Sequence, residues 1–165
     1  MAKRILIFTA VVLALVGLMI SCTISGMSDV EFAKELMVES ADATGLYDTS
    51  AGSKSGSPVG EGLTITIDLL DGNPEETGPY IVTLTFDDFT PGFAPNSLVN
   101  GVLTAVVTIE IENELVTIIF DGQLTVVGEH AGIYYFSANL IIDLSTGEYT
   151  YSGEITIDGK VHKTG

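Results

Sequence analysis

Residues 136–157 read FSANLIIDLSTGEYTYSGEITI, and apolar and polar side chains alternate there on both sides of a turn signal. This stretch decides the fold, because a two-residue turn at Thr146 and Gly147 would pair the flanking segments as antiparallel strands. The predicted opposite pairs are Ser145 with Glu148, Leu144 with Tyr149, Ile142 with Tyr151, Leu140 with Gly153, Ala138 with Ile155 and Phe136 with Ile157. One face of the hairpin becomes almost wholly apolar, as in a sheet that buries one side.

Two further turn signals precede this hairpin. A two-residue turn at Asn113 and Glu114 also gives one apolar face. It pairs Ile111 with Val116, Ile109 with Ile118 and Val107 with Phe120. The next signal contains Asp121 and Gly122. A three-residue loop over 121–123 is expected there, because it sets Phe120 opposite Leu124 and keeps both on the apolar face.

Alternation with a period of two begins at Leu63. LTITIDLL (63–70) and YIVTLTFDDF (80–89) place apolar side chains on one face and mainly Thr or Asp on the other. Residues 63–165 are therefore expected to form a mainly β domain, an antiparallel β-meander of about seven or eight strands. A curved open sheet and a barrel both fit this pattern, since a barrel removes the edges and a helix can cover an open sheet.

One short helix is predicted over residues 29–40. Ser28 is followed three residues later by Glu31, the pattern of a capping box, and Phe32 and Leu36 recur at helical spacing. The region after the helix is rich in Gly, Ser and Thr and indicates a flexible linker. Residues 22–62 are thus expected to form a tether, this helix and a linker, and the helix either packs on the β domain or projects it.

The N-terminus has the pattern of an export signal. Lys3 and Arg4 precede a mostly apolar run over 5–20, and Cys22, the single cysteine, follows Ser21. The stretch LMISC (18–22) resembles the lipobox of bacterial lipoprotein precursors, with Met19 where Leu is commonest. The resemblance implies that residues 1–21 are a signal peptide removed by cleavage. It also implies that Cys22 receives a diacylglycerol on its sulfur, and often an acyl chain such as palmitate on its amino group.

Two other interpretations of this segment remain open. The apolar run is only slightly shorter than a membrane-spanning helix, so it could be an uncleaved anchor. A cleaved signal with an incidental cysteine would give simple secretion instead. The lipoprotein interpretation has a physical advantage, since two or three acyl chains hold a domain stably on a membrane.

The chain is strongly acidic beyond Cys22. All 22 acidic residues follow that position, and once Lys3 and Arg4 are removed only four basic residues remain, so the formal charge is −18. Such a domain repels nucleic acid and anionic lipids. The acidity fits solubility in a saline medium, a cationic partner or divalent-cation binding. The 144 residues from Cys22 onward suffice for one domain with a core.

No catalytic motif is recognisable. His130 is expected in a hairpin loop, with Glu129 and His130 as an alternative surface site, and His162 lies near the C-terminus. The acidic loop after residue 67 is expected to be an ordinary connection, with calcium binding as the alternative. The candidate metal ligands there are Asp68, Asp71, Asn73, Glu75 and Glu76. Tyr149 and Tyr151 are predicted on the core face and Tyr135 on the outer face.

These observations predict a non-enzymatic, lipid-anchored protein of the bacterial cell envelope, with its domain on the extracytoplasmic side and no cofactor. It would bind an envelope protein, a glycan or a cationic partner, or act structurally. One alternative is a barrel-type carrier of a small apolar ligand, which requires an interior cavity. The other is a carboxylate-dependent hydrolase, which requires two facing acids in a cleft.

Overall fold

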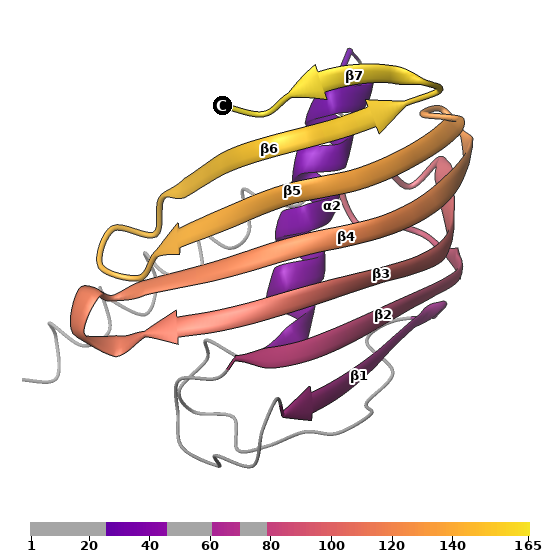
Figure 1. Ribbon diagram of the computed structural model, residues 1–165. Helices are drawn as coiled ribbons and strands as arrows, with labels where there is room; N and C mark the ends of the chain where they lie inside the picture. The colour runs from indigo at the N-terminus through magenta and orange to yellow at the C-terminus, as the bar shows by residue number, and fades with distance from the viewer. Residues whose placement is uncertain (1–25, 46–60, 70–78) are drawn as a thin grey trace, which may run out of the picture.

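The structure is a computed structural model that describes residues 26–45, 61–69 and 79–165. Helix α2 (Asp29–Thr44) lies across one face of a sheet (Figure 1). A short 3-10 helix, η1 (Ile111–Asn113), connects two of the strands. The strands are β1 (Leu63–Leu69), β2 (Tyr80–Phe89), β3 (Ser97–Glu110), β4 (Leu115–Gly128), β5 (Gly132–Asp143), β6 (Tyr149–Ile157) and β7 (Lys160–Lys163).

The sheet is an open antiparallel meander. Its seven strands lie side by side in the order in which they occur in the sequence, and each pairs antiparallel with the next. In the described part of the chain β1 pairs only with β2 and β7 only with β6, so the sheet does not close into a barrel. The predicted mainly β meander is confirmed, in its curved-sheet form.

The two faces of the sheet differ in what covers them. We call the face toward α2 the inner face and the opposite one the outer face. Alternate residues of each long strand are buried on the inner face, as in Val82 and Leu84 of β2 and Ile118 and Phe120 of β4. The faces predicted from the alternation are therefore confirmed for the described side chains of β1 and β2.

Helix α2 begins with the predicted capping box. The Ser28 hydroxyl accepts a hydrogen bond from the Glu31 N–H at 3.3 Å, and a Glu31 carboxylate oxygen accepts the Ser28 N–H at 2.8 Å. The helix continues four residues beyond the predicted end and stops at Gly45, whose φ of +60° suits glycine. Its buried face packs into the core of the sheet, so the helix does not project the domain. The buried apolar residues of the helix are Phe32, Ala33, Leu36, Met37 and Ala41.

The β5–β6 turn is longer than predicted. Ile142 lies opposite Tyr149, so the register differs by two residues from the prediction for a two-residue turn. The Asp143 carboxylate accepts hydrogen bonds from the N–H groups of Ser145 and Thr146, at 2.9 and 3.1 Å, and these bonds stabilise the longer turn. Because side chains alternate with a period of two, this shift leaves every paired residue on its predicted face.

The register predicted for the β3–β4 turn is also wrong, by two residues. Ile109 lies opposite Val116, because η1 takes up the residues that were expected to continue the strand. Glu114 ends this turn in the left-handed region, with a φ of +53°. Ile111, predicted on the apolar face, is instead 55% exposed.

The predicted loop over residues 121–123 does not exist. Strand β4 continues through it, and Gly122 lies opposite Leu103 of β3. The φ of Gly122 is +144°, and a Cβ there would lie 2.5 Å from the carbonyl oxygen of Val102. This glycine therefore permits a bent strand and a close backbone approach rather than a turn.

Candidate functional site

Most of the residues predicted to carry chemistry lie outside the described part of the chain. Cys22 is one of them, and so are the candidate metal ligands Asp71, Asn73, Glu75 and Glu76. Asp68 is exposed at the end of β1, on the outer face. Within residues 26–45, 61–69 and 79–165, no three His, Cys, Asp or Glu side chains are grouped so that they could hold a metal ion.

His130 occupies the β4–β5 loop, as predicted, but it is buried. Its Nδ1 lies 3.0 Å from Asp29 Oδ1, and its ring stacks on Phe32 with centroids 4.7 Å apart. The Tyr134 hydroxyl donates to the His130 carbonyl oxygen at 2.8 Å. Burial, followed by the charges of Asp29 and Asp158, raises the pKa of Tyr134. We call His130, Asp29, Phe32 and Tyr134 the His130 cluster, and its contacts fix the first turn of α2 to the sheet.

The tyrosines separate as the alternation predicts. Tyr135 is 47% exposed on the outer face. Tyr151 is half-buried at the edge of the core, and the ammonium group of Lys34 lies 5.0 Å from its ring centroid. Burial, then the nearby Glu35 and Tyr149, raises the pKa of Tyr151 to about 12. Tyr149 shares the inner side with Tyr151 but is 41% exposed near the turn.

A row of uncharged side chains crosses the whole outer face. We call it the outer row. Its members lie directly opposite one another in successive strands: Thr64, Thr85, Val102, Gln123, Tyr135, Thr156 and Val161. Strands lie about 4.8 Å apart, so the row extends over about 29 Å. In a chain of formal charge −16, an uncharged stripe of this length is a distinctive surface.

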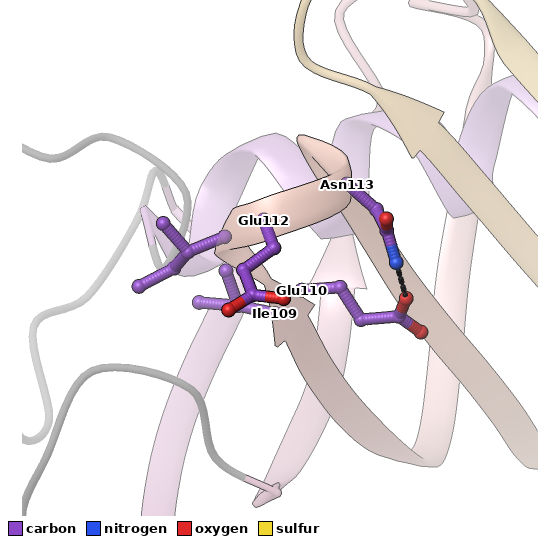
Figure 2. Close-up of a pocket in the computed structure, with 5 residues that line it drawn as sticks. Ile109, Glu110, Glu112 and Asn113 are labelled. Carbon is purple, nitrogen blue, oxygen red and sulfur yellow. Dashed lines mark hydrogen bonds between the residues drawn. The ribbon is translucent and has the colours of Figure 1, made fainter.

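A hollow lies at the β3–β4 turn and is lined by residues 109–113 (Figure 2). Two carboxylates, those of Glu110 and Glu112, and the apolar side chain of Ile111 face it. Glu110 accepts a hydrogen bond from Asn113 Nδ2 at 2.9 Å, so part of the hydrogen-bonding capacity of its carboxylate is used within the turn. The hollow is open and local to one turn, and both of its carboxylates come from the same short segment.

Sequence reasoning missed two polar contacts that involve α2. One is His130 with Asp29, and the other is the Glu39 carboxylate, which accepts the backbone N–H of Gly92 at 2.9 Å. The partners are 101 and 53 positions apart in the chain. Only the packing of α2 on the sheet brings them together, and no local pattern signals it.

Comparison with known proteins finds no match to this chain among protein-family models, curated proteins or solved structures. Of the described residues, no helical segment combines the length and the apolar character that a membrane span requires. The candidate site is therefore defined by its own geometry, and the outer row is an uncharged line of side chains that crosses all seven strands of the described sheet.

Proposed function

We propose that this protein is a non-enzymatic bacterial lipoprotein, held to a membrane of the cell envelope through lipid on Cys22, whose domain binds a partner through its outer face. Support for the anchor comes from the basic start, the apolar run and the placement of Cys22. Six residues, 23–28, separate Cys22 from α2 and span at most about 25 Å when extended. A lipid at that position would hold the domain close to the membrane.

The outer row supports the binding role and is the observation that carries the proposal. The domain repels anionic partners through its net charge, while the row itself has no charge. Tyr135 offers an exposed aromatic ring, and Gln123 and Thr156 directly beside it supply hydrogen-bonding groups. Apolar C–H groups and hydroxyls alternate on the surface of a sugar chain, so we assign an uncharged glycan as the partner.

Two other functions receive less support from the geometry. A carrier needs the apolar inner face to be open to its ligand, whereas α2 places Phe32, Leu36 and Met37 on that face with at most 1% exposure. A carboxylate-dependent hydrolase needs acids that face each other across a cleft. In the described part of the chain, the acids whose pKa values are raised by burial are Glu39 and Asp42, and they lie three residues apart on one helix.

The anchor is tested by replacing Cys22 with Ser in the full-length chain. Incorporation of labelled fatty acid and retention in the membrane fraction should both be lost, because no other thiol is present in the chain. Met19→Leu is the matched control, since it introduces the residue commonest at that lipobox position and should leave labelling intact. Unchanged labelling of Cys22→Ser would contradict the anchor and leave the binding proposal standing.

Binding is tested with immobilised uncharged polysaccharides, chitin and β-glucan, and with a polyanionic polysaccharide for comparison. The wild-type chain should be retained on an uncharged polymer and not on the anionic one. Tyr135→Ala should bind roughly tenfold more weakly, the value of one aromatic contact. Tyr149→Ala removes a similarly exposed ring away from the row and should bind normally. Equal binding by both variants would refute the assignment of the row.

A further inference from the structure

Glu39 lies between α2 and the segment 90–96 that connects β2 to β3. One carboxylate oxygen, Oε1, accepts the Gly92 N–H at 2.9 Å. The other oxygen, Oε2, has almost no exposed surface and no hydrogen-bond partner in the described structure. In the same segment, Phe93 contacts Phe32 of α2 with ring centroids 5.5 Å apart. The segment is therefore held to the helix by one polar and one aromatic contact.

The surroundings of Glu39 disfavour a negative charge. Segment 90–96 reads TPGFAPN and contains no ionisable side chain. Among the described residues, the charged groups that act on Glu39 are Glu35 and Asp42, which are acidic and belong to the same helix. Burial, the largest cause, raises the pKa of Glu39, the Gly92 N–H opposes the shift, and the two acids add to it. An ionised Glu39 would bury one carboxylate oxygen without a donor, which is costly.

We propose that Glu39 is a proton-operated latch that holds segment 90–96 on α2 when it is protonated and releases the segment when it is ionised. In the closed state the neutral carboxyl group stays between the two elements and accepts the Gly92 N–H. On ionisation the proton passes to solvent, and the carboxylate rotates outward to be hydrated. Gly92 then loses its acceptor. Because Phe93 belongs to the same segment, its contact with Phe32 of the His130 cluster loosens as well.

The latch is tested by hydrogen exchange of the Gly92 amide in the full-length chain, followed by NMR between about pH 5 and pH 7.5. After correction for the intrinsic pH dependence of exchange, protection of this amide should fall several-fold as the pH rises. In Glu39→Gln, which cannot ionise, protection should be independent of pH. The exposed Glu35 lies one turn away on the same helix. Glu35→Gln should keep a pH-dependent profile, displaced slightly to lower pH because one negative charge that raises the pKa of Glu39 is lost.

Two results would overturn the proposal. One is a wild-type Gly92 amide whose corrected protection does not change with pH. The other is a Glu39→Gln variant that keeps the wild-type pH dependence, since the titrating group would then lie elsewhere. A purely structural role for Glu39 would lower Gly92 protection in the variant equally at every pH, and it would not remove the pH dependence.

Discussion

The inner and outer faces of the sheet are built by the same strands, yet side chains of the same type are buried on one face and exposed on the other. Ile118 and Ile119 are neighbours in β4, and their exposed fractions are 0% and 47%. On β3, Val107 is fully buried and Val102 is 46% exposed. Residue type does not explain the difference. It follows from α2, which among the described elements supplies a second layer on one face only, and so it shows that one helix determines where the core lies.

The largest expected effect is a direct test of that contrast at adjacent positions. Ile118→Ala should lower the free energy of unfolding by about 2–5 kcal/mol, because it leaves a cavity beneath α2. Ile119→Ala removes the same atoms from the outer face and should cost less than about 1 kcal/mol. Urea denaturation of the two variants measures both values. Similar losses would mean that the outer face is also covered in the folded protein.

The glycines sharpen the contrast between strand interiors and turns. Gly122 has a φ of +144° and its position has no room for a Cβ, whereas Gly147, with a φ of +73°, has no atom within 4 Å of such a Cβ. Gly122→Ala should destabilise by about 2–3 kcal/mol through backbone strain and crowding. Gly147→Ala should cost only about 1 kcal/mol, the left-handed backbone penalty. Denaturant midpoints compare them, and the reverse order would place the turn at Gly122.

These positions also explain how far the sequence predicts the fold. Alternation identifies the inner face of every long strand, because burial repeats with a period of two. It does not fix the register, since a turn longer by two residues gives the same faces. In the β5–β6 turn, the Asp143 carboxylate accepts a hydrogen bond from the Ser145 N–H. In the β3–β4 turn, Glu114 adopts the left-handed backbone conformation. The loop predicted over residues 121–123 is wrong because a glycine after Asp is as typical of a bent strand as of a turn.

The candidate sites were less predictable than the fold. The outer position of Tyr135 follows from alternation, but the outer row becomes visible only when the true register aligns its members across seven strands. The contacts of Glu39 and His130 depend on how α2 lies on the sheet. The capping box locates the beginning of α2, and it carries no information about the strands that the helix will contact.

A smaller effect is expected at the start of the covering helix. Ser28→Ala removes the acceptor for the Glu31 N–H and disrupts the capping box, so it should destabilise by about 1 kcal/mol. Ser137→Ala, on the exposed outer face of β5, is the matched control and should change the stability by less than about 0.5 kcal/mol. Thermal unfolding monitored by circular dichroism compares the two. If Ser28→Ala matched the control, the first turn of α2 would be held by the His130 cluster alone.

The smallest expected effect is the pH dependence of stability, in which partly buried acids of α2 and exposed acids act in opposite directions. Burial raises the pKa values of Glu39 and Asp42. Hydrogen bonds from Ser28 lower the pKa of Glu31, and the bond from the Ser28 backbone N–H has the largest effect. Hydrogen bonds from Ser145 and Thr146 lower the pKa of Asp143. The first two acids favour the folded state at low pH, and that contribution is lost as the pH rises through their raised pKa values.

Glu31 and Asp143 act in the opposite direction, since their contribution exists above the ordinary carboxyl pKa near 4 and disappears as the pH falls through their lowered pKa values. The melting temperature should therefore rise from about pH 7 to about pH 5, helped by weaker repulsion among the 22 acidic residues, and fall again below about pH 4. The double variant Glu39→Gln, Asp42→Asn should lose part of the rise and keep the fall. A melting temperature that is highest at neutral pH in the wild-type chain would show that Glu39 and Asp42 of α2 are hydrated in the folded state. The contrast between the two sides of the sheet would then be one of apolar burial alone.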